Sequence, residues 1–152
     1  MTGAVVGAVT AAITGDAMLT LPLRLHPGDD LRAAVVAALL GSGHQAGFVL
    51  QGIGSLEVAQ LRYAGREDTT ELRGDLEILT LAGSIAVDGA HLHMSVSDAR
   101  GHVFGGHVGP GCVIRTTAEL LLALFPEQRF TRELDLRTGF PELKISPDRP
   151  RR

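Results

Sequence analysis

Residues 89–107, GAHLHMSVSDARGHVFGGH, carry the clearest strand pattern in this chain. The first half of this stretch alternates between apolar and polar side chains. Alternation with a period of two is typical of a β-strand that buries one face. The predicted buried face carries Ala90, Leu92, Met94 and Val96, and the opposite face carries His91, His93, Ser95 and Ser97.

The second half of this stretch predicts the return strand of a hairpin. Residues 99–101 suit a three-residue loop with Gly101 in the left-handed conformation, so that Asp98 pairs with His102. In that register His93 lies directly opposite His107, with His91 diagonal to it. A four-residue loop would instead move His107 to the other face of the sheet.

His91, His93 and His107 are therefore predicted to form a metal site. Three neutral imidazoles suit zinc or another divalent metal and leave one coordination position open. That position could hold water, a small ligand or a residue of another subunit. The alternative is that the three histidines are polar surface groups or hydrogen-bonded groups at an interface.

Outside the hairpin, the apolar patterns predict several further strands and one clear helix. The helix follows a cap at Asp29 or Asp30. Residues 116–125 fit either a helix that opens with a capping box or a strand. The expected fold is α+β with a mostly antiparallel sheet. The predicted strands are residues 19–25, 46–53, 56–63, 76–86, 129–136 and 142–145. Pro22 places the first of them at a sheet edge or beside a bulge. The apolar phase of residues 76–86 slips between Ile78 and Leu79, which indicates either a bulge or burial on both faces.

Length and composition fit one domain. We expect a lead-in segment over residues 1–17, a compact domain over 18–146 and a basic flexible tail over 147–152.

The formal net charge of −3 gives no sign of the basic surface that is typical of DNA-binding domains. Cys112 is the single cysteine, expected to be buried and inert. With neither a signal-peptide pattern nor a membrane-spanning run, a cytoplasmic location is expected.

The sequence offers no recognisable catalytic set. Its candidate carboxylate bases are Glu77, Asp98 and Glu119, and nothing in the spacing places one of them at the histidines. Gly52 and Gly54 do not continue into a dinucleotide fingerprint, because position 57 is Glu. No catalytic residue and no nucleotide cofactor are therefore predicted.

Three motifs in order resemble one known family. They are GDLEILTLAG at residues 74–83, the histidine hairpin of residues 91–107, and the segment from Arg132 through TGFPEL at residues 138–143. Together they resemble the plant- and prokaryote-conserved (PPC) domain over about residues 19–145. The first motif departs mildly from the family pattern, with Leu76 in place of Phe, and Thr80 and Ala82 in place of Ser.

The resemblance implies a compact α+β domain that assembles as a homotrimer. It favours a long strand over residues 116–125 and matches the family's histidine pattern. In plants the domain follows a DNA-binding AT-hook with the sequence Arg-Gly-Arg-Pro, which does not occur here.

Three functions follow from these observations. The first is a homotrimeric binding or assembly module with a three-histidine metal or small-ligand site, with a regulatory role among its uses. The second is a DNA-associated regulatory protein, and the third is a metal-dependent enzyme that acts on a small substrate. The first explains the sequence best, because it needs no catalytic set.

Overall fold

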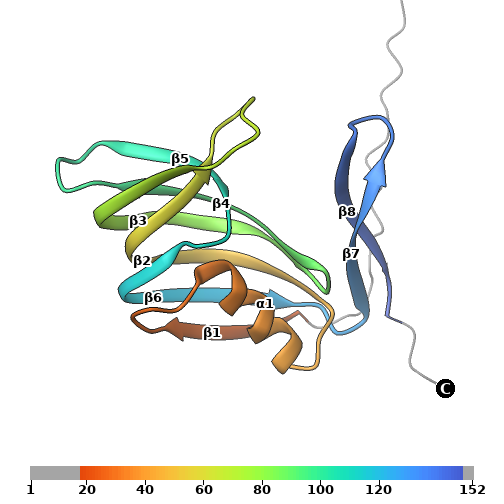
Figure 1. Ribbon diagram of the computed structural model, residues 1–152. Coiled ribbons are helices and arrows are strands. Elements are labelled where there is room, and N and C mark those ends of the chain that lie inside the picture. The colour runs from red at the N-terminus through yellow and green to blue at the C-terminus, as the bar shows by residue number, and fades with distance from the viewer. Residues whose placement is uncertain (1–17, 149–152) are drawn as a thin grey trace, which may run out of the picture.

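The computed structural model describes residues 18–148. The predicted lead-in segment and residues 149–152 of the predicted tail lie outside this range. Residues 18–148 form one helix and eight strands, which are labelled in Figure 1. The elements are β1 (Leu19–Leu25), α1 (Leu31–Gly41), β2 (Ala46–Arg62), β3 (Thr70–Ala86), β4 (Gly89–Ser97), β5 (Val103–Val108), β6 (Val113–Leu124), β7 (Gln128–Asp135) and β8 (Phe140–Pro147).

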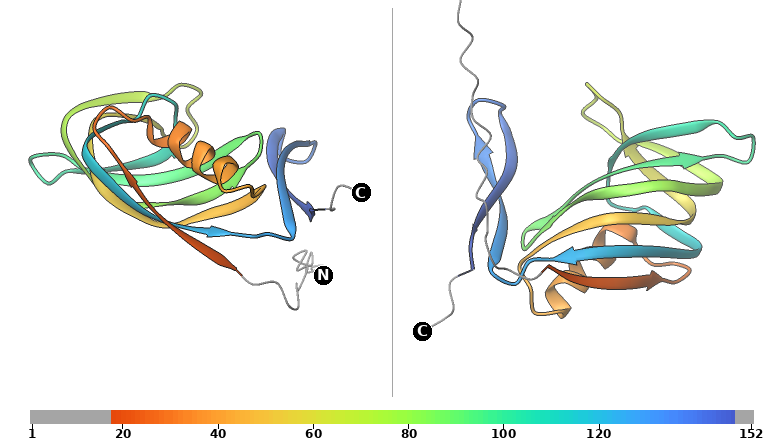
Figure 2. Two further views of the ribbon diagram at one scale, coloured as in Figure 1. Left: turned by 90° about the horizontal axis from the view of Figure 1, so that it is seen from below. Right: turned by 180° about the vertical axis from the view of Figure 1, so that it is seen from behind.

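Six strands form one antiparallel sheet in the order β1-β6-β2-β3-β4-β5, and β2 also pairs with β5. This extra pairing curls the sheet, and α1 lies across its concave side (Figure 2). The predicted α+β fold is confirmed, and so is the edge position of the proline-containing strand β1. Within the described range, no helix is long and apolar enough to cross a bilayer.

The helix begins and packs as its sequence predicts. The Asp30 side chain accepts a hydrogen bond from the Ala33 amide at 2.8 Å, which caps the first turn. The same carboxylate accepts from the Gly111 amide at 2.7 Å and so ties the helix start to the segment before β6. Leu31, Val35 and Leu39 are fully buried in the main core against the sheet.

Residues 46–62 form one strand, so the prediction of two strands separated at Gly54-Ser55 was wrong. Gly54 stays within the ladder, opposite Ile78 on one side and Ala118 on the other. A Cβ atom at Gly54 would lie 2.3 Å from the Thr117 carbonyl oxygen. The glycine therefore permits close approach of β6 rather than a turn.

The predicted bulge in β3 is confirmed. The pairing with β4 shifts register between Ile78 and Thr80. Leu79 is 43% exposed, whereas Ile78 and Leu81 are buried, so the extra residue restores the inward phase of the strand. Residues 87–88 form the following turn, because Gly89 already pairs with Ala86.

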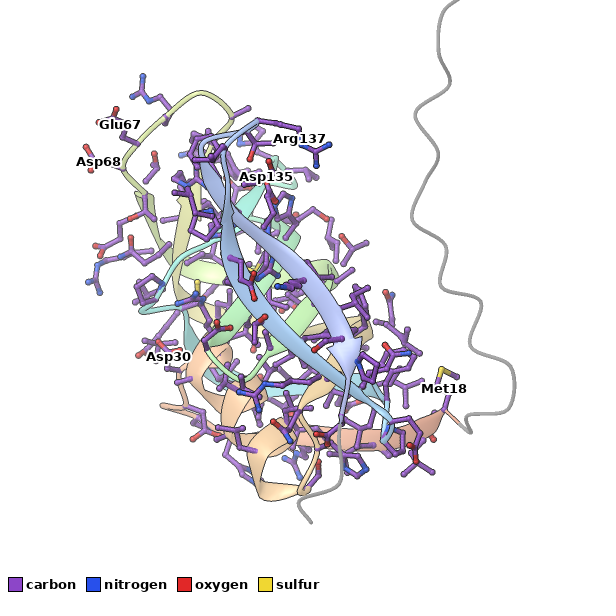
Figure 3. The ribbon with its side chains drawn as sticks, turned by 90° about the vertical axis from the view of Figure 1, so that its right-hand side faces the viewer. Met18, Asp30, Glu67, Asp68, Asp135 and Arg137 are labelled. Atoms are coloured by element: carbon purple, nitrogen blue, oxygen red, sulfur yellow. The ribbon has the colours of Figure 1, made fainter. Side chains whose placement is uncertain are left out.

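Strands β7 and β8 form a separate two-stranded sheet that leans against the end of the main sheet. Its anchor is Phe130, which packs on Phe48 and Phe125 at ring-centroid distances of 5.6 and 5.9 Å. Figure 3 shows this hairpin in the foreground, with Asp135 and Arg137 at its tip. The tip of the hairpin is mostly exposed, whereas the start of β7 is packed against the main sheet through Phe130.

Candidate functional site

The hairpin of β4 and β5 has the predicted register. The Asp98 amide donates to the His102 carbonyl oxygen at 3.0 Å, and Gly101 has a φ of +81°. His93 consequently lies directly opposite His107. The Asp98 carboxylate also accepts from the amides of His102 and Arg100, and these hydrogen bonds lower the pKa of Asp98.

The structure brings the three predicted ligands together on the outer face of the hairpin. The Nε2 atoms of His91 and His93 lie 3.1 Å apart, and one ligand atom from each of the three histidines lies within 4.8 Å of the others. Two nitrogens bound to one tetrahedral zinc at about 2.1 Å would be about 3.4 Å apart. The nitrogens of His91 and His93 are thus already spaced for a shared ion, and His107 lies within reach of the same ion.

The chemistry of the three imidazoles also suits a cation. Burial, with Arg132 next, lowers the pKa of His91. Burial, followed by the charges of His91 and Arg62, lowers the pKa of His107 to about 4. Both shifts favour the neutral form of these two rings, which keeps a lone pair available for a metal. The Nδ1 atom of His107 is buried without a hydrogen-bond partner, which a metal or a bound ligand could supply.

Two arginines lie beside the histidines, and no local sequence pattern predicts either position. Arg62 on β2 is the direct cross-strand neighbour of His107. Arg132 on β7 donates from its guanidinium to the Ser84 hydroxyl, and Ser84 is the cross-strand neighbour of His91. Arg132 stands in the third family-like motif, but only the folded hairpin brings it to the site.

The carboxylates considered as bases lie away from the cluster. Glu77 is exposed opposite Ser97, and Glu119 is exposed on β6, opposite Arg24 on β1. Asp98 is engaged with the hairpin loop. Glu142 on β8 is the acidic group near enough to raise the pKa of His91. The structure therefore adds Glu142 to the surroundings of the site and provides no base from the predicted set.

Cys112 is fully buried, as predicted. Its sulfur accepts a hydrogen bond from the Gln60 amide at 3.2 Å, and burial raises the pKa of the thiol to about 11. Because the thiolate is the reactive form, this cysteine is inert near neutral pH.

The sequence model of the Plants and Prokaryotes Conserved (PCC) domain matches residues 2–126. The chain belongs to this family. The match ends just before β7, so the hairpin that carries Arg132 and Glu142 lies beyond the matched part of the PCC domain. The resemblance seen in the histidine hairpin and in the GDLEILTLAG motif is thereby confirmed.

Relatives of this PCC domain occur alone and within longer proteins. A bifunctional protein GlmU from a Synechococcus strain is 51% identical over 126 residues, which cover 83% of this chain and 20% of that protein. The chain thus spans about a fifth of that relative. The structure of a hypothetical protein from Salmonella is 37% identical with a TM-score of 0.83, and the match covers 88% of this chain and 97% of the other.

Two more distant structures share the fold. A metal-containing protein from Archaeoglobus fulgidus is 24% identical with a TM-score of 0.71, over 86% of this chain and 96% of its own. A protein from Ralstonia eutropha described as a candidate DNA-binding protein is 23% identical with a TM-score of 0.66, over 82% of this chain and 89% of its own.

Proposed function

We propose that this chain is a self-assembling binding module of the PCC family in which His91, His93 and His107 hold a divalent metal, with zinc the first choice. The observation that carries the proposal is the convergence of three imidazoles from two paired strands. Three histidines leave one zinc position open for a ligand. The metal-containing Archaeoglobus protein with the same fold supports metal binding.

A homotrimer is the assembly that the family resemblance implies, and the surface supports burial against further copies. Exposed apolar side chains gather on the outer face of β2, β3 and β6, where a soluble monomer would bury or replace them. They are Leu50, Ile53, Leu79 and Leu121. Pro22, Ile53 and Leu121 also line a shallow groove of ≈ 750 Å³ on this face.

Metal content and assembly mass test the two parts of the proposal. Protein purified without chelator and dialysed against a slight excess of zinc should hold one zinc per chain by elemental analysis. His93→Ala should hold about tenfold less or none, because two imidazoles chelate weakly. His26→Ala is the matched control, because His26 is exposed and directly follows β1, outside the histidine hairpin. Equal zinc in His93→Ala and in the control would refute the site.

Sedimentation equilibrium of the same samples tests the assembly. The expected mass is that of three chains of 16.0 kDa each. A monomer at micromolar concentration would refute the trimer and leave the metal site standing.

A DNA-associated role is the second candidate, and the description of the Ralstonia protein is the observation that favours it. Phosphate binding by a folded surface depends strongly on salt. If the module binds duplex DNA, the affinity should fall steeply between low and physiological salt. Absence of binding at low salt would leave the metal-binding module as the account of this chain.

A further inference from the structure

Three arginine side chains lie near the histidine cluster, and each of them is bonded to a neutral oxygen. Arg32 donates to the Ala90 carbonyl at 3.0 and 3.2 Å, and Arg62 donates to the Arg66 carbonyl at 3.3 Å. Arg132 donates to the hydroxyl of Ser84. Over residues 18–148, none of the three forms an ion pair with a carboxylate within 4.0 Å.

These positive charges act on the histidines themselves. The charges of Arg132 and Arg62 both lower the pKa of His91, and those of Arg62 and Arg32 lower the pKa of His107. The same closeness is seen in the geometry, because Arg62 pairs with His107 across the strands, Arg132 is hydrogen-bonded to the partner residue of His91, and Arg32 is hydrogen-bonded to the carbonyl of the residue before His91. The arginines therefore belong to the same electrostatic site as the three imidazoles.

The position of Arg132 is unfavourable for its charge. Burial lowers its pKa, so its guanidinium is partly removed from water. The charges of Asp88 and Glu142 offset part of this cost, but neither carboxylate forms an ion pair with the Arg132 guanidinium within 4.0 Å, and Asp88 instead accepts a hydrogen bond from the backbone amide of Arg132 at 2.9 Å. A partly desolvated cation without an ion pair is unfavourable unless an anion completes the site.

A bound metal ion would increase the excess of positive charge at the site. The three imidazoles are neutral ligands, so a divalent ion would keep its full charge beside Arg62 and Arg132. Of the nearby carboxylates, Glu142 and Asp88 offset part of this positive charge. A small anion that reaches both the open metal position and a guanidinium would neutralise the remainder.

We propose that the site binds a small oxyanion, a carboxylate or a phosphate group, at the open metal position, with Arg62 and Arg132 as its positioning cations. Arg62 approaches from β2 beside His107, and Arg132 approaches from β7 beside His91. The two arginines thus flank the cluster from opposite sides. This inference rests on the proposed metal site and names the class of ligand that the site takes.

Calorimetric titration of the zinc-loaded protein with inorganic phosphate, and separately with malonate, tests the proposal. Binding of either anion supports it, and the tighter one identifies the source of the oxyanion. Arg62→Gln and Arg132→Gln should each weaken binding about tenfold to a hundredfold, the effect of losing one charged hydrogen bond. Because Arg132 also contacts Ser84, Arg62→Gln gives the cleaner result if the hairpin shifts.

Arg100→Gln is the matched control, because Arg100 lies exposed in the loop of the same hairpin and should leave anion binding unchanged. A second readout is the visible spectrum of the cobalt-substituted protein, which should change when the anion enters the coordination shell. Failure of both anions to bind a zinc-loaded protein, or equal binding by all three variants, would overturn the proposal.

The same titrations separate this inference from the proposed function. If the protein binds no metal, titration of the metal-free protein with phosphate still tests the arginines. Binding that is lost in Arg62→Gln would then support an anion site without a metal, and absence of binding would overturn both proposals.

Discussion

Gly83→Ala should destabilise the domain by roughly 3–5 kcal/mol, because it combines backbone strain with overpacking. Gly83 has a φ of +147°, which side chains rarely adopt. A Cβ atom there would lie 2.0 Å from the His91 carbonyl oxygen and 2.8 Å from the Leu92 Cα. The strand that carries the histidines would have to move away from β3.

Urea unfolding of Gly83→Ala and Gly74→Ala measures the two effects separately. Gly74 lies in the same strand with a φ of +125°, but a Cβ atom there would meet nothing within 4 Å. Gly74→Ala should therefore lose only the strain, about 1–2 kcal/mol. Equal losses in the two variants would show that β4 does not approach β3 as closely as described.

Phe130→Ala should detach the β7–β8 hairpin. Phe130 is 1% exposed and fills a small satellite core with Phe48 and Phe125. Truncation of a buried phenylalanine costs about 3–5 kcal/mol. An isolated two-stranded hairpin is marginally stable in water. The loss should therefore appear first as local opening of the hairpin, while the main core stays folded.

Hydrogen exchange of the β7 and β8 amides measures this opening. Phe140→Ala is the control, because Phe140 lies on the same hairpin but is 63% exposed. Phe130→Ala should lose protection across the hairpin, whereas Phe140→Ala should keep it. Because Arg132 sits on β7, Phe130→Ala should also weaken anion binding at the histidine site. Unchanged protection in Phe130→Ala would contradict the anchoring role of Phe130.

The histidine register could be predicted from sequence because it depends on local chemistry. Gly101 alone fixes the loop length, and strict alternation along β4 then determines which residues face outward. The bulge at Leu79 was visible for the same reason, as a change of phase within one strand. Alternation with a period of two thus shows which face of a strand each side chain occupies, as long as the residues are close in the sequence.

Contacts between segments that are distant in the sequence produce no local pattern from which they could be predicted. Arg132 meets Ser84 across 48 residues, and Arg62 meets His107 only because β2 pairs with β5. The sequence pattern predicts a break between strands at Gly54, whereas in the structure this glycine lets β6 approach β2 closely. A glycine in a strand has both meanings, and only the packing of the neighbouring strand decides between them.

The proposed function depends on His91, His93 and His107 binding one metal ion together. X-ray absorption spectroscopy at the zinc edge of the zinc-loaded protein tests this most directly, because it reports the number and distance of the ligand atoms. We expect three imidazole nitrogens at about 2.0–2.1 Å, completed by an oxygen ligand. A shell made of oxygens alone, or one with a single imidazole, would contradict it.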